Sequence, residues 1–113
     1  MNELTQKKCV PCEVGGMPVK QGEAAELAKQ LNVEWQISYE AGFGKRMERK
    51  FKFKNFVHAM EFVNKVAKLA EEEGHHPDFH VHYNEVRIEL WTHAVGGLSE
   101  NDFIVAAKID EID

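Results

Sequence analysis

Residues 71–83 read EEEGHHPDFHVHY and mark the point where a helical pattern gives way to an alternating strand pattern. Four of the chain's six histidines lie in this stretch. His75 and His76 are adjacent and cannot share one helix face, while Pro77 biases His76 toward an extended backbone. We therefore expect a short, stiff corner that holds two imidazoles between a helix and a strand. His93 ends the next strand pattern, where a hairpin would return it toward the corner.

On the N-terminal side of the corner, apolar residues recur every three or four positions and predict a long helix. Asn55 is placed to cap the first turn of this helix, because its side chain can accept from a free backbone N–H. The expected apolar stripe consists of Phe56, Met60, Val63, Ala67 and Ala70, widened by Val57, Val66 and Leu69.

On the C-terminal side of the corner, two runs alternate between faces and predict a hairpin. In the first run Phe79, Val81 and Tyr83 share one face, and His80 and His82 share the other. Asn84 and Glu85 can turn the chain. In the second run the inward residues are Val86, Ile88 and Leu90, and the outward residues are Arg87, Glu89, Trp91 and His93.

The remaining segments complete an α+β fold in the order α-β-β-α-β-β-α. Residues 22–31 predict a short helix, and a hairpin follows with a turn at residues 42–44. Its apolar residues, which alternate with polar ones, are Trp35, Ile37 and Tyr39 in the first strand and Met47, Phe51 and Phe53 in the second. Ser99 and Asp102 resemble a capping box and begin a last helix. Because hairpins join neighbouring strands, we expect a four-stranded antiparallel sheet with helices packed on one face.

Composition limits the classes of protein to consider. A chain of 113 residues with 43% hydrophobic residues can form one core. We expect one domain at residues 22–113, preceded by a loosely ordered arm at residues 1–21. The net charge of −5 argues against nucleic-acid binding, and the basic run at residues 45–54 is typical of a solvated strand face. No apolar stretch approaches the roughly 20 residues that span a bilayer, so we expect a cytoplasmic protein without a membrane partner.

The arm contains Cys9 and Cys12 in a C-x-x-C spacing. This spacing is typical of half a zinc site or of a redox pair, but no second such pair is present and no βαβ pattern surrounds it. We expect two reduced thiols and assign no function to them.

Three interpretations of the histidines are open at this point. His80 and His82, with Glu85 and His93, loosely resemble a carboxylate-histidine metal site. His75, His76 and His93 could instead form a metal-free acid/base site, since an unperturbed imidazole has a pKa of about 6.5. The third interpretation is structural: a His-Pro corner that ends a helix and docks a loop.

Several short motifs together resemble the signature of the pterin-4a-carbinolamine dehydratases. They are Glu71-x-x-x-His75-His76-Pro77-Asp78, Tyr83-Asn84-x-Val86, Thr92-His93 and Gly97-Leu98-Ser99-x-x-Asp102. The match runs without an apparent gap from Glu71 to Asp102 and extends more loosely upstream through Phe51, Phe53 and Phe56 to Trp35. Two positions depart from the family pattern. Gly74 stands where many members carry an acidic residue, and Asn101 stands where some carry arginine.

The resemblance implies a lyase that removes water from 4a-hydroxytetrahydrobiopterin and gives quinonoid dihydropterin, in tetrahydrobiopterin recycling. It implies three active-site histidines, His75, His76 and His93, that need neither a metal nor an organic cofactor. It further implies supporting or substrate-binding roles for Glu71, Asp102 and Trp35. The expected partners are a pterin substrate, further copies of the chain in a homodimer or homotetramer, and an aromatic amino acid hydroxylase coupled in function. The alternatives are a weakly catalytic pterin-binding module and a histidine-cluster metal-binding protein.

Overall fold

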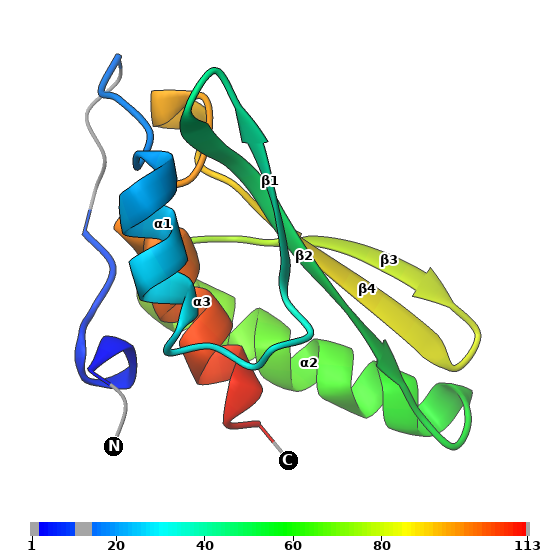
Figure 1. Ribbon diagram of the computed structural model, residues 1–113. Coiled ribbons are helices and arrows are strands. Elements are labelled where there is room, and N and C mark those ends of the chain that lie inside the picture. The colour runs from blue at the N-terminus through cyan, green and yellow to red at the C-terminus, as the bar shows by residue number, and fades with distance from the viewer. Residues whose placement is uncertain (1–2, 11–14, 113) are drawn as a thin grey trace.

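The computed structural model describes residues 3–10 and 15–112. Within them the chain forms the expected α+β fold, with helices covering one side of a four-stranded antiparallel sheet (Figure 1). The strands lie in the order β1-β2-β4-β3. The elements are η1 (Leu4–Gln6), α1 (Gln21–Ala28), β1 (Gln36–Glu40), β2 (Phe43–Lys52), α2 (Phe56–Glu73), β3 (Asp78–His82), β4 (Glu85–Leu90), η2 (His93–Val95) and α3 (Glu100–Asp110).

Helix α2 begins and ends where its sequence signals indicate. The Asn55 side chain accepts a hydrogen bond from the His58 N–H at 2.9 Å, which caps the first turn. At the other end Gly74 adopts a left-handed conformation with φ of 68°, where glycine carries no steric cost. The helix therefore stops one residue before the histidine pair.

The buried face of α2 differs from the expected stripe. The buried residues are Ala59, Phe62, Val66 and Ala70, whereas Phe56 and Val57 are 48% and 63% exposed. The prediction was wrong at the start of the helix and at Ala67, which is also exposed, because two overlapping apolar stripes both fit helical spacing. Contacts distant in sequence select one of them: the Phe62 ring lies 4.6 Å from Phe51 and 5.0 Å from Phe53.

Both hairpin turns lie one residue earlier than the sequence pattern suggested. Ala41 and Gly42 form the first turn with φ of 53° and 85°, so Phe43 already belongs to β2. Tyr83 and Asn84 form the second turn, so Tyr83, with φ of 52° and 67% exposure, lies outside the strand in which it was expected to share a face with Phe79 and Val81. Alternation of side chains locates a strand but leaves the register at its end open by one residue.

Helix α3 is the centre of the core. Eight of its residues are buried: Asn101, Asp102, Phe103, Ile104, Val105, Ala106, Ala107 and Ile109. Such a helix is enclosed on nearly all sides. The sheet supplies Met47, Val86, Ile88 and Leu90, each with 0% exposure. The predicted capping box is confirmed, since Asp102 accepts a hydrogen bond from the Ser99 N–H at 2.9 Å.

The described part of residues 1–21 packs on the helices. Leu4, in η1, is 1% exposed and belongs to the main hydrophobic cluster. The N–H of Leu4 donates to the Gln30 side chain at 3.3 Å. Cys12 lies outside the described residues, whereas Cys9 is a half-buried free thiol. Among residues 3–10 and 15–112, no helix combines the length and apolar content needed to cross a bilayer.

Candidate functional site

The histidine corner is built by the end of α2 and the start of β3. After Gly74 turns the chain, the His75 N–H donates to the Ala70 carbonyl at 3.2 Å and satisfies a carbonyl of the last helical turn. Pro77 is buried, and Asp78 opens β3. This geometry turns the two neighbouring imidazoles into different surroundings: the His75 side chain is 13% exposed and the His76 side chain is 60% exposed.

His75 is paired with a fully buried carboxylate. Its Nε2 lies 2.6 Å from Asp102 Oδ1, and the Asp102 side chain has 0% exposure. The other oxygen, Oδ2, accepts from the Thr92 hydroxyl at 2.8 Å and from the Ser99 N–H at 2.9 Å. Thr92 Oγ1 and Ser99 Oγ are also 2.8 Å apart. The carboxylate thus has partners on both oxygens, as a buried charge requires.

These contacts define which nitrogen of His75 can accept a proton. An ionised carboxylate only accepts hydrogen bonds, so the nitrogen that faces Asp102 is the one that carries hydrogen. In the neutral ring the remaining nitrogen, Nδ1, is then an acceptor. When Nδ1 takes a proton, Asp102 stabilises the positive ring that results. A buried carboxylate in this position fixes both the tautomer and the orientation of a catalytic imidazole.

His76 is paired with Glu71, one of the last residues of α2. His76 Nε2 lies 2.6 Å from Glu71 Oε2, as close as the His75 pair, but the Glu71 side chain is 77% exposed. Water competes for both groups at this surface, so the pair contributes little to stability. It can nevertheless hold the His76 ring near the corner.

The sequence pattern predicted that His93 shares a strand face with Arg87 and Glu89, but the structure places His93 outside the strand. Strand β4 ends at Leu90, and His93 begins η2. Its ring packs 3.8 Å from the ring of Trp91, measured between centroids. The preceding residue, Thr92, bonds Asp102 and so ties the start of η2 to the His75 pair. No hydrogen bond joins His93 to His75 or His76 within residues 3–10 and 15–112.

Trp35 lies at the opposite end of α3 from Asp102. Its indole N–H donates to Asp110 Oδ1 at 2.7 Å, and Arg49 Nη1 donates to the same oxygen at 2.6 Å. Asp110 lies eight positions after Asp102 in the helix, a rise of about 12 Å. The structure therefore brings together Glu71, His75, His76 and Asp102, and it places Trp35, 7% exposed, in the core beside Asp110.

Thr92 and Ser99 are functional candidates that the sequence reasoning did not assign. Both occur in the motifs, but their shared contact with Asp102 depends on the folded arrangement of β4 and α3. His80 and His82 belong to β3, and His80 Nε2 is buried without a hydrogen-bond partner among the described residues. Among the described residues, no three His, Cys, Asp or Glu side chains are placed to hold one metal ion.

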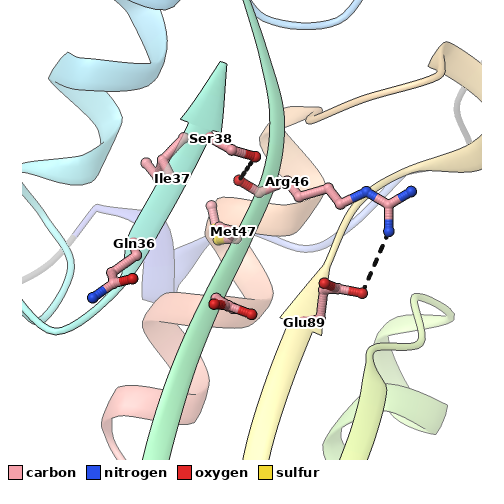
Figure 2. A pocket seen from close by; sticks show the side chains of 7 residues that line it. Gln36, Ile37, Ser38, Arg46, Met47 and Glu89 are labelled. Atoms are coloured by element: carbon pink, nitrogen blue, oxygen red, sulfur yellow. Dashed lines mark hydrogen bonds and ion pairs between the residues drawn. The ribbon is translucent and has the colours of Figure 1, made fainter. Parts of the chain in front are cut away.

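A hollow over the sheet, shown in Figure 2, lies outside the histidine corner. Its lining comes from β1, β2 and β4 and comprises Gln36, Ile37, Ser38, Arg46, Met47, Glu48 and Glu89. The Arg46 guanidinium reaches Glu89 at 3.4 Å and lies 4.6 Å over the Trp91 ring, the same ring that packs on His93. No histidine is among the residues that line the hollow, whereas the corner holds two.

Comparisons with known proteins identify the family to which the chain is similar. A family model described as pterin 4 alpha carbinolamine dehydratase matches residues 17–112. A protein of Nitrosomonas eutropha named as such a dehydratase is 50% identical over 108 residues, covering 96% of this chain and 91% of the relative. The mitochondrial pterin-4-alpha-carbinolamine dehydratase 2 of Arabidopsis thaliana is 43% identical over 111 residues, covering 97% of this chain and 59% of the relative.

Two solved structures share the fold of this chain. A crystal structure of a transcriptional coactivator/pterin dehydratase from Brucella melitensis is similar with a TM-score of 0.72 and 33% identity, covering 81% of this chain and 94% of the other. A pterin dehydratase-like protein identified as a RuBisCO assembly factor shares the fold, with a TM-score of 0.56, 23% identity, and coverage of 68% and 86%. From its motifs, its fold and these matches, the chain belongs to the pterin-4a-carbinolamine dehydratase family.

Proposed function

We propose that this protein is a hydro-lyase that dehydrates 4a-hydroxytetrahydrobiopterin to quinonoid dihydropterin by metal-free acid/base catalysis. The observation that carries the proposal is the hydrogen bond between His75 Nε2 and the buried Asp102 carboxylate, at 2.6 Å. It gives one imidazole a fixed tautomer beside a second imidazole, His76, in a chain of this family. The family membership supplies the substrate class.

The reaction requires two proton transfers and no change in redox state. The bond from the 4a carbon to the hydroxyl oxygen breaks, and an acid protonates the oxygen as it leaves as water. A base removes the proton from the adjacent ring nitrogen, whose electron pair forms the new C=N bond. Positioned imidazoles can serve in both roles, each contributing about 10²–10⁴-fold in rate.

We assign the base to His75, because its Nδ1 is the free acceptor when Nε2 donates to Asp102. His76 and His93 are then the candidates for the acid. Glu71 supports a protonated His76 from 2.6 Å. Trp35 stabilises the core through Asp110 in this proposal rather than contacting the pterin.

The alternative is a pterin-binding module that retains little catalysis. Fold does not determine activity, and the same fold occurs in a protein described as a RuBisCO assembly factor. The His75–Asp102 pair favours the enzyme, because a binding site alone does not need a buried acid/base pair.

One assay separates the possibilities. The carbinolamine is generated in place by an aromatic amino acid hydroxylase, and its decay is followed with and without the chelated protein. We expect acceleration that survives exhaustive chelation. Saturable pterin binding without acceleration would favour the binding module, and activity lost to chelator and restored by one metal would favour a metal site.

The setting of the enzyme follows from the same proposal. We place it in the cytoplasm, where it would act in tetrahydrobiopterin recycling beside an aromatic amino acid hydroxylase. The catalytic domain spans residues 22–113, close to the 17–112 range of the family model.

Strands β1 and β3 form the two edges of the sheet, and a homodimer or homotetramer would cover such edges. Light scattering at micromolar concentration tests this, and a monomer would contradict it.

A further inference from the structure

The N-terminal segment, residues 4–10, touches both helices that carry the His75–Asp102 pair. Leu4 is buried, and η1 packs on α3. The N–H of Cys9 donates to Glu73 Oε1 at 2.9 Å, and Glu73 is the last residue of α2. The segment then continues to α3 through Val10. It therefore spans the gap between the end of α2 and the start of α3.

The contact with α3 is a two-way amide clamp. The Val10 N–H donates to Asn101 Oδ1 at 3.1 Å, and Asn101 Nδ2 donates to the Val10 carbonyl at 2.6 Å. This pairs a side-chain amide with a backbone amide as in a β ladder. Asn101 is 6% exposed and directly precedes Asp102 in the first turn of α3. The segment thus holds the residue next to the buried carboxylate.

A buried ion pair links Glu73, the residue of α2 that the segment contacts, to Lys108 of α3. Lys108 Nζ lies 2.6 Å from Glu73 Oε2, where the side chains are 17% and 5% exposed. Burial acts to raise the pKa of Glu73, but hydrogen bonds from Lys108 and from the Cys9 N–H outweigh it and leave that pKa lowered. Glu73 is therefore a charged anchor that lies two residues before His75.

The Cys9 thiol has a structural role in this arrangement. Burial, reinforced by the charge of Glu73, raises the pKa of the thiol to about 12. The nucleophilic form of cysteine is the thiolate, so this thiol is a poor nucleophile near neutral pH. Its sulfur lies 3.6 Å from the Asn101 carbonyl oxygen, which adds a further contact between the segment and α3.

We propose that residues 4–10 position the His75–Asp102 pair for catalysis, with Asn101 and Glu73 as positioning residues. The inference rests on the proposed dehydratase function and extends it to a segment outside the histidine motif. His75 follows α2 and Asp102 lies in α3, so the 2.6 Å contact depends on the spacing of the two helices. A bridge between the same helices fixes that spacing. Misplacing a catalytic group by about 1 Å can cost about 10²-fold in rate.

The test compares Asn101→Ala with Lys7→Ala, a control at a second contact between the segment and α3. Lys7 contacts α3 through an exposed ion pair with Glu100, at 3.0 Å. We expect Asn101→Ala to lower kcat about three- to tenfold while half-saturation changes less than about twofold. Lys7→Ala should leave both within about twofold of wild type. The isosteric Asn101→Asp keeps the acceptor for the Val10 N–H and should give an intermediate kcat, so it carries the test if Asn101→Ala does not fold.

A spectroscopic measurement separates this inference from the proposed function. The imidazole proton shared by His75 and Asp102 should give a proton NMR signal protected from solvent, assigned by its loss in His75→Ala. We expect Asn101→Ala to broaden this signal by solvent exchange and Lys7→Ala to retain it, even if the wild-type protein proves inactive. A folded Asn101→Ala variant with the wild-type signal and wild-type kcat would overturn the proposal.

Discussion

Two histidine–carboxylate pairs stand side by side at the corner, and they differ in burial rather than in length. His75 with Asp102 and His76 with Glu71 both have a nitrogen–oxygen distance of 2.6 Å. The first carboxylate is fully buried, and the second is 77% exposed. Neighbours in sequence, the two histidines thus have opposite surroundings. The nitrogen–oxygen distance alone therefore does not identify the pair that matters for stability and catalysis.

The physical reason lies in what replaces each partner when it is removed. At an exposed pair, water solvates either group, and measured contributions are about 0–1 kcal/mol. At a buried pair, a lost partner leaves a polar group without a hydrogen bond, which costs about 1–3 kcal/mol and more for a charge. Asp102 also accepts from Thr92 and Ser99. Its loss therefore disturbs the histidine corner, the residue before η2 and the first turn of α3 at once.

The largest effect should come from Asp102→Asn, which is isosteric but replaces one acceptor oxygen with a donor. Whichever way the amide points, its NH₂ faces either His75 or the donors from Thr92 and Ser99. We expect the dehydration rate to fall about 10²-fold or more, because a neutral amide no longer stabilises the protonated His75 ring and, in one of its two orientations, also removes the tautomer that leaves Nδ1 as base. Turnover kinetics give this loss directly. Urea unfolding should show a stability loss of about 1–3 kcal/mol.

Asp102→Asn could also give the opposite result. A variant that unfolds at the wild-type urea midpoint and keeps its rate would mean that the buried carboxylate neither fixes the His75 ring nor stabilises the fold. Burial would then not distinguish the His75–Asp102 pair from the His76–Glu71 pair.

The two roles of Asp102 also explain how far the sequence could go. Its role as a helix cap was predictable, because Ser99 and Asp102 have the local spacing of a capping box. Its bond to His75, 27 positions away, was not predicted, since the family resemblance implied only a supporting role for Asp102. The Trp35 bond to Asp110 spans 75 positions and left no signal in local alternation. Periodicity identified the elements and the sheet, whereas long-range contacts determined partners and the buried stripe of α2.

A smaller difference should separate His75→Ala from His76→Ala, two truncations of adjacent residues. We expect His75→Ala to lower turnover at least about tenfold, with water or another imidazole partly replacing the base. His76→Ala should raise half-saturation at least as much as it lowers turnover, and its unfolding free energy should stay within about 0.5 kcal/mol of wild type. Steady-state kinetics and urea unfolding of both variants measure the contrast.

Three further truncations serve as references for that contrast. His93→Ala should lower turnover at least about tenfold as a candidate acid. His80→Ala and His82→Ala, in β3, should change turnover little. A large loss at His80 or His82, with His75 and His93 tolerant, would instead favour the metal site that the sequence pattern left open.

The smallest effect should come from Glu71→Gln, the exposed counterpart of Asp102→Asn. Glutamine keeps an oxygen that can accept from His76 Nε2, and water already reaches this pair, whose side chains are 60% and 77% exposed. We expect turnover and half-saturation to stay within about twofold and stability within about 0.5 kcal/mol. Glu72→Gln, an exposed neighbour on the same helix, is the matched control. A tenfold fall in turnover for Glu71→Gln but not for Glu72→Gln would show that bound substrate desolvates the second pair, so that both pairs act as buried pairs during the reaction.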